Sequence, residues 1–90
     1  MEQDINKIID AMKVVLKTNL FKEDEDGNMV REHTESRLTM QYRFNFMHSQ
    51  VRLEQRENRF HWTKMGSESY KKIKILKDGF IFNGNKIAIR

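Results

Sequence analysis

Apolar side chains recur every three to four positions near the start of the chain. They are Ile5, Ile8, Ile9, Met12, Val15, Leu16 and Leu20. The positions between them carry mainly charged or amide side chains, which is the pattern of a helix with one buried face. Acidic residues come first in this stretch and lysines come later, which suits the direction of the helix dipole. The spacing predicts an amphipathic helix over residues 2–20.

The period of the pattern changes to two at Arg37. Residues 38, 40, 42, 44 and 46 are apolar and alternate with polar residues, as in a strand with one buried face. Shorter alternations follow at residues 51–54, 59–63, 72–75 and 80–89. The last of these contains Asn83-Gly84, a pair that suits the tight type I′ turn of a hairpin. The pattern predicts about six strands in sequence, with Gly66–Ser69 as one of the turns between them.

The segment between the predicted helix and the predicted strands, residues 21–36, is dominated by the acidic run from Glu23 to Asn28. Asp, Asn and Gly tolerate the left-handed backbone angles that tight turns require. The run either tips a short hairpin that joins Leu20-Phe21 to Met29-Val30 or forms a mobile loop. We favour the hairpin.

Short connections make neighbouring strands antiparallel, and alternation gives the sheet one apolar and one polar face. We therefore expect an α+β fold in which an N-terminal amphipathic helix packs on an antiparallel meander of five or six strands. A strongly curled, nearly closed sheet is the alternative. Ninety residues suit a single domain, with the helix at 2–20, the acidic turn or short hairpin at 21–36 and a basic sheet at 37–90.

The aromatic residues of the predicted sheet are expected to form its core. The helix stripe should cover the sheet face that bears Phe44, Phe60 and Trp62, although a ligand pocket between helix and sheet is an alternative use of the same residues. Met65 and Tyr70 fit neither face, and together with Met47 they are interpreted as an exposed patch for a partner.

The chain contains no cysteine and no proline. Small extracellular domains usually compensate for a thin core with disulfides, so we expect a reducing, cytoplasmic location. No apolar run approaches the roughly 18 residues of a membrane-spanning helix, so no membrane partner is expected. Abundant lysine and asparagine without proline are typical of AT-rich genomes, such as those of phages and mobile elements.

The formal net charge of +4 conceals a difference between the two parts of the chain. Residues 1–36 carry five basic and nine acidic side chains, a net charge of −4, whereas residues 37–90 carry twelve basic and four acidic ones, a net charge of +8. Such asymmetry is typical of proteins that contact nucleic acid or another polyanion. Alternation places these candidate binding residues on the polar sheet face: Arg37, Arg43, Arg52, Arg59, His61, Lys72 and Lys74. The alternative is that they keep the protein in solution and guard its strand edges.

No residue pattern predicts a catalytic site or a bound cofactor. His61-Trp62-Thr63 fits the H-x-T motif of phosphoesterases that carry two such motifs, but neither His33 nor His48 supplies the second one. The serines lack the glycines of a nucleophile elbow, and the four glycines stand singly rather than in a phosphate-binding loop.

The acidic turn partly matches a calcium-binding loop. Asp24, Asp26 and Asn28 have the spacing of its first three ligands, and Glu35 has the spacing of its last. Met29, however, stands where that loop requires glycine. We expect a solvated acidic turn here and no metal site.

These patterns predict a non-enzymatic binding or regulatory protein that engages an anionic partner, nucleic acid or an acidic protein surface, through a basic sheet face. The alternative is a small inhibitor or adaptor of the kind that phages and mobile elements encode, which blocks or bridges a protein partner, for example by an exposed strand edge. A hydrolase or nuclease ranks third. A thin core and a free C-terminal strand at Lys86–Arg90 also predict a homodimer or larger assembly.

Overall fold

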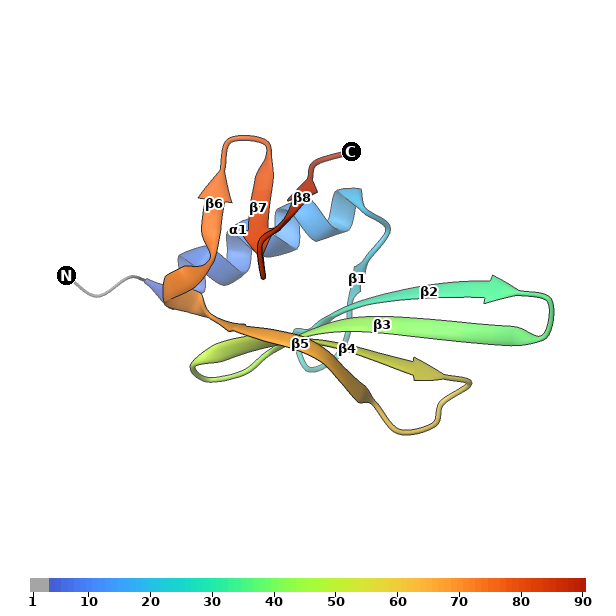
Figure 1. The fold of residues 1–90 in the computed structure, drawn as a ribbon. Coiled ribbons are helices and arrows are strands. Elements are labelled where there is room, and N and C mark those ends of the chain that lie inside the picture. Colours follow the sequence, from blue (N-terminus) through green and yellow to red (C-terminus); the bar gives the residue numbers. More distant parts are fainter. Residues whose placement is uncertain (1–3) are drawn as a thin grey trace.

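A computed structural model describes residues 4–90 of the chain (Figure 1). In chain order its elements are α1 (Ile5–Thr18), β1 (Lys22–Glu23), β2 (Met29–Glu35), β3 (Leu38–Phe46), β4 (Gln50–Glu57), β5 (Thr63–Ser69), the 3-10 helix η1 (Tyr70–Lys72), β6 (Lys74–Leu76), β7 (Gly79–Phe82) and β8 (Asn85–Ala88). The first five strands form one antiparallel sheet in chain order, and the last three form a second. The predicted α+β class with an N-terminal helix is confirmed. Within residues 4–90 both sheets are open rather than closed into a barrel.

Helix α1 is capped at its start by Asp4, whose side chain accepts a hydrogen bond from the backbone N–H of Asn6 at 3.0 Å. Such a cap stabilises a helix by about 1 kcal/mol, because the first N–H groups have no partner within the helix. The helix ends at Asn19, and Leu20 then turns the chain with a φ of 71°. The predicted helix is confirmed, although residues 2 and 3 of its predicted range lie outside the described residues.

The predicted hairpin after the helix is present, but its first strand is Lys22–Glu23 rather than Leu20-Phe21, and its second strand is longer than expected. β1 pairs with Met29 and Val30 at the start of β2. β2 then continues to Glu35 and pairs along its whole length with β3. A two-residue turn makes this possible, because Ser36 adopts a φ of 57° and returns the chain directly into β3. Residues 31–35 are polar on both faces, so no apolar alternation marks them as a strand.

The strand predicted at residues 59–63 is not formed. Asn58 and Arg59 adopt φ values of 47° and 72°, which turn the chain out of β4 into an irregular loop that ends at Trp62. β5 then occupies the region where a turn at Gly66–Ser69 was predicted. It pairs with β4 through a register shift at Leu53 and Glu54. Backbone pairing rather than apolar alternation defines this strand.

The chain leaves the first sheet at η1, so the single meander expected from the sequence is divided into two sheets. Tyr70, at the start of η1, is only 1% exposed, and its hydroxyl donates a hydrogen bond to the carbonyl of Met47 at 2.8 Å. Burial raises the pKa of Tyr70 from 10.0 to about 12. The prediction of an exposed Tyr70 is therefore wrong. Asn83 and Gly84 adopt φ values of 50° and 78°, as the predicted tight hairpin turn requires.

The core lies where α1, the second sheet and the near end of the first sheet meet (Figure 1). The ring of Phe44 is at its centre, with centroids 5.5 Å from Phe21, 6.2 Å from Phe80 and 5.4 Å from Phe82. The other buried apolar side chains are Ile8, Met12, Val15, Leu16, Met29, Val51, Tyr70 and Ile73. The predicted packing of the helix stripe in the core around Phe44 is thus confirmed for its middle part, whereas Ile5 and Leu20 at its two ends are exposed.

The far part of the first sheet projects beyond the helix (Figure 1). We call residues 31–41 and 55–64, the ends of the β2–β3 and β4–β5 hairpins, the distal arm. None of its residues is buried, and the molecule measures 48 × 26 × 25 Å along its principal axes.

Candidate functional site

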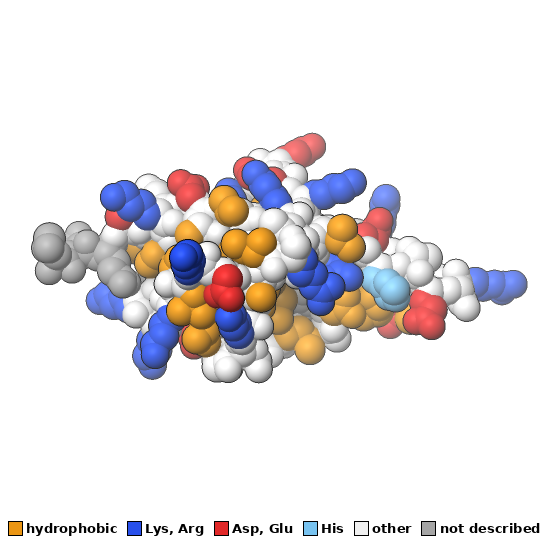
Figure 2. Space-filling view, turned by 90° about the horizontal axis from the view of Figure 1, so that it is seen from above, with side chains coloured by type: hydrophobic (Ala, Val, Ile, Leu, Met, Phe, Trp, Pro, Cys, Tyr) orange, Lys and Arg blue, Asp and Glu red, His pale blue; other side chains and the backbone are white. Residues whose placement is uncertain are grey.

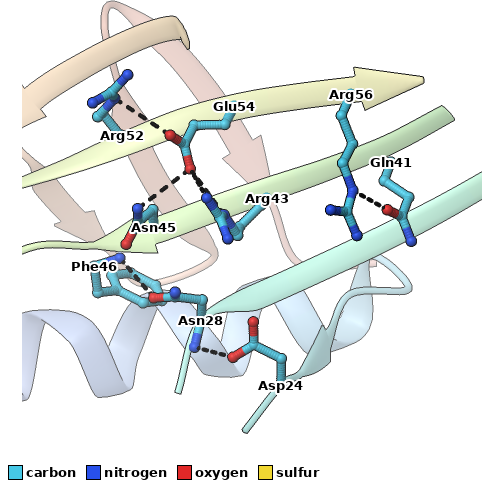
Figure 3. Close-up of polar contacts among 9 residues, drawn as sticks. All are labelled: Asp24, Asn28, Gln41, Arg43, Asn45, Phe46, Arg52, Glu54 and Arg56. Carbon is cyan, nitrogen blue, oxygen red and sulfur yellow. Dashed lines mark hydrogen bonds and ion pairs between the residues drawn. The ribbon is translucent and has the colours of Figure 1, made fainter. Parts of the chain in front are cut away.

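The polar face of the first sheet carries a network centred on the carboxylate of Glu54 (Figure 3). Glu54 is only 4% exposed. Arg43 donates to its Oε1 through Nε at 2.8 Å and approaches the same oxygen with Nη2 at 2.6 Å. Asn45 donates to Oε1 at 3.3 Å, and Nε of Arg52 lies 3.5 Å from Oε2. A buried carboxylate without such partners is costly, so Arg43 and Arg52 have a structural role here.

A second set of contacts joins three strands on the same face. Arg56 on β4 donates to the side-chain carbonyl of Gln41 on β3 (Figure 3). Gln41 in turn donates to Glu32 on β2 at 2.9 Å. The Trp62 ring lies against two guanidinium groups, whose central carbons are 4.2 Å (Arg43) and 4.3 Å (Arg56) from its centroid. Trp62 therefore packs on the polar face. The prediction that it lies under the helix is wrong, because it belongs to a loop rather than to an alternating strand.

The loop between β4 and β5 carries aromatic and basic side chains, several of them exposed. Phe60 is 69% exposed, and Arg59 and His61 on either side of it are exposed as well. Trp62 is half-buried, and Lys64 is exposed near the start of β5. We call residues 59–64 the aromatic–basic loop. Aromatic rings beside cations can stack bases while the cations neutralise phosphates, which is how single-stranded nucleic acid is commonly bound.

The binding residues predicted from the sequence do not share one face. They fall into three groups: Arg43 and Arg52 in the Glu54 network, Arg37, Arg59 and His61 on the distal arm, and Lys72 and Lys74 in η1 and β6. The common face was expected from a single sheet. It is not formed, because the chain changes sheet at η1.

Four further residues of the candidate site were missed by sequence reasoning: Arg56, Phe60, Trp62 and Lys64. The sequence does contain a signal, because Arg59, Phe60, His61 and Trp62 alternate basic or imidazole groups with aromatic rings. A half-buried strand shows the same alternation. The two positive φ angles that precede Phe60 decide between them, and they are visible only in the structure.

The acidic turn uses its own side chains to close. Asp24 Oδ1 accepts hydrogen bonds from the backbone N–H groups of Asp26 at 2.9 Å and Asn28 at 2.8 Å (the second is drawn in Figure 3). Asn28 Oδ1 accepts from the N–H of Phe46 at 3.0 Å, which fastens the turn to β3. Within residues 4–90, no group of three or more His, Cys, Asp or Glu side chains is arranged to hold a metal ion.

A groove of about 720 Å³ lies between the apolar face of the first sheet and the ends of α1 and β8. Apolar side chains that include Tyr42, Phe44 and Ile87 line it, together with four basic ones: Arg31, His33, Lys86 and Arg90. Among the described residues that line this groove, none is acidic. Lys86 also donates to Asp78 at 2.9 Å, and this hydrogen bond lowers the pKa of the exposed Asp78 carboxyl.

Basic side chains are spread along the molecule on the face that carries the second sheet, with hydrophobic side chains exposed between them (Figure 2). Charge alone therefore does not mark a site there, and the clustering of aromatic with basic groups is the more specific signal. No helix in the described part of the chain is both long and apolar enough to cross a membrane. No protein-family model, curated protein or solved structure matches this chain.

Proposed function

We propose that this protein is a non-enzymatic, regulatory binding protein that engages single-stranded nucleic acid through the aromatic–basic loop. One observation carries the proposal: a single loop carries Phe60, which is 69% exposed between Arg59 and His61 in the sequence, and Trp62, whose ring lies against two guanidinium groups. Single apolar side chains are common on protein surfaces, but two aromatic rings and several cations within one loop supply the groups with which single-stranded nucleic acid is bound. A cytoplasmic location is part of the proposal.

The cations divide into those that can contact phosphates and those that are already neutralised. Arg59 and Lys64 are exposed and make no ion pair with another residue of the described chain, so they are available to phosphates. Arg43 and Arg52 share the Glu54 carboxylate, so they add less to the potential outside the protein. Binding should be driven by stacking and by release of counterions, and it should be tolerant of sequence.

The test is fluorescence anisotropy with a labelled oligodeoxythymidylate of about 16 nucleotides, with a duplex of equal length as the comparison. Phe60→Ala should weaken single-strand binding about tenfold, because loss of a stacked base costs about 1–3 kcal/mol. Arg59→Glu combined with Lys64→Glu should weaken single-strand binding at least about tenfold. For the native protein, the logarithm of the binding constant should fall with the logarithm of the salt concentration, with a slope of about −0.7 per phosphate contacted.

The matched control is Lys72→Glu combined with Lys74→Glu, which changes the net charge by the same amount in η1 and β6. These variants should bind within about threefold of the native protein, because their cations lie outside the proposed site. Equal losses of binding affinity in both charge variants would show that nucleic acid is attracted by the overall charge of the protein, and would contradict the proposed site. Absence of binding to DNA and RNA, single-stranded or duplex, would contradict the function and favour an inhibitor or adaptor with a protein partner.

A further inference from the structure

The outer edge of β2 is unpaired over much of its length. β1 covers Met29 and Val30, and among the described residues no strand pairs with 31–35 on that side. Residues 32–35 are exposed, and Arg31 is half-buried beside the groove. An open edge presents backbone N–H and C=O groups that another strand can bind.

The hydrogen bonds of Thr39 show which backbone groups of β2 point outward. Thr39 uses its C=O and N–H on the β4 side, accepting from the Asn58 N–H at 2.8 Å and donating to the Asn58 side chain at 2.9 Å. Thr34, its partner on β2, therefore forms no backbone hydrogen bond with Thr39 and directs its own N–H and C=O outward. Backbone groups alternate in direction along a strand with a period of two residues, so Glu32 also directs its N–H and C=O outward.

The other edges are closed or short. On β5, the carbonyl of Ser67 accepts a hydrogen bond at 3.0 Å from the side-chain amide of Asn83, in the amide orientation that satisfies both of its polar atoms. The pairing of β5 with β4 is also irregular. On β8, the carbonyl of Ala88 accepts from the side chain of Asn19 at 2.9 Å. This bond partly covers the C-terminal edge that the sequence predicted to be free. β6 has three residues. Along the described part of the chain, residues 31–35 of β2 thus form an edge with no strand paired on its outer side.

We propose that two copies of this chain pair antiparallel along this edge, with His33 of both copies at the two-fold axis. This register places Glu32 of one copy opposite Thr34 of the other. Both residues direct their backbone groups outward, so each such pair exchanges two hydrogen bonds. Arg31 then lies opposite Glu35 of the other copy in a non-hydrogen-bonded pair, where facing side chains are closest.

The charges of the strand favour this register over the one centred on Glu32. Symmetry produces the Arg31–Glu35 attraction twice. In a register that places Glu32 of one copy opposite Glu32 of the other, two like charges face each other. A shift of the register by one residue leaves the outward backbone groups without hydrogen-bond partners. Arg31 makes no ion pair within residues 4–90, and Glu35 has only an exposed contact with His33 at 3.8 Å. Both charges are available to a second copy.

Charged residues on an edge strand usually prevent such pairing. They do so when the charges repel an incoming strand, whereas here they complement the same strand in a second copy. The pairing covers only about five residues on each copy, so the interface belongs at the small, transient end of protein–protein contacts. We therefore expect a dimer that dissociates on dilution.

The test is sedimentation equilibrium of the nucleic-acid-free protein from about 10 μM to about 1 mM. The native chain should shift from the monomer mass of 10.9 kDa toward twice that value. Arg31→Glu or Glu35→Arg alone should weaken the dimer about tenfold or more, because two attractions become repulsions. The double variant should recover to within about threefold of the native dissociation constant. An equimolar mixture of the two single variants should also associate, since each supplies the charges that the other lacks.

Two further variants separate this surface from general effects. Thr34→Pro should abolish the dimer while the chain stays folded, because it removes an N–H that points away from β3. Arg37→Glu, with the same charge change at the neighbouring turn, should leave the dimer within about threefold of the native. A monomer mass at every concentration, or a dimer insensitive to Arg31→Glu and Thr34→Pro, would overturn the proposal. Because no nucleic acid is present, neither outcome depends on the proposed function.

Discussion

The two ends of the molecule are built on different physical principles. At the core end, α1, the second sheet and the near part of the first sheet bury a set of apolar side chains around Phe44, which is only 2% exposed. In the distal arm no residue is buried, and strand pairing and polar contacts such as Arg56–Gln41–Glu32 connect the strands. Stability should therefore be concentrated at one end, and surface available for partners at the other. The aromatic–basic loop and the open edge of β2 both lie in the arm.

The same substitution in both regions gives the largest expected contrast. Phe44→Ala should lower the free energy of unfolding by about 3–5 kcal/mol, because it leaves a cavity among three other phenylalanine rings. Phe60→Ala should change it by less than about 0.5 kcal/mol, because most of that side chain is already in water. Urea unfolding followed by circular dichroism measures both values.

A similar cost for the two alanine variants would contradict the division into a packed end and an open arm. Phe60 would then have to pack against the sheet, and the aromatic–basic loop would lose the exposed ring on which its proposed function depends. A mild effect of Phe44→Ala would instead show that the core end can collapse around the lost ring.

The next contrast concerns two glutamates on β4. Glu54→Gln should destabilise the protein by about 2–4 kcal/mol, because it leaves two partly buried arginines without their shared carboxylate. Glu57→Gln, an exposed substitution of the same type, should stay within about 0.5 kcal/mol of the native value. Chemical denaturation at neutral pH measures the difference. Equal small effects would show that the Glu54 network adds no net stability and that Arg43 and Arg52 are free to bind a partner.

The fold could be predicted from the sequence wherever apolar spacing matches burial. The helix stripe contains Met12 and Leu16, both fully buried, and the strand alternation around Phe44 marks β3. Residues 31–35 of β2 and most of β5 could not be predicted in this way. Their side chains are mostly polar, and their strand structure depends on backbone pairing with β3 and β4, which single-sequence periodicity does not report.

The candidate site was predictable as a set of residue types but not as an arrangement. Arg59 and His61 were identified from their charge, whereas Phe60 and Trp62 were assigned to the core because they alternate with them. The pairing of Arg43 with Glu54 depends on the register between β3 and β4, which places the two residues opposite each other. Cross-strand register is a tertiary property, so an arginine on a polar face cannot be classed as free or neutralised from periodicity alone.

The smallest predicted effect concerns Tyr70, which links the two sheets. Tyr70→Phe removes the hydrogen bond to the Met47 carbonyl and should cost about 1 kcal/mol at neutral pH. Because burial raises the pKa of Tyr70 from 10.0 to about 12, the folded state holds this proton more tightly than the unfolded chain. That contribution is complete below the unfolded pKa and is lost as the pH rises through the folded one. The native protein should therefore lose its higher stability relative to Tyr70→Phe between pH 10.0 and about 12. Free energies of unfolding of both proteins, measured across this pH range, test this. The two proteins differ only in the Tyr70 hydroxyl, so the difference between the two curves isolates Tyr70. Parallel curves would mean that its hydroxyl reaches water, and that η1 is packed less tightly than the rest of the core end.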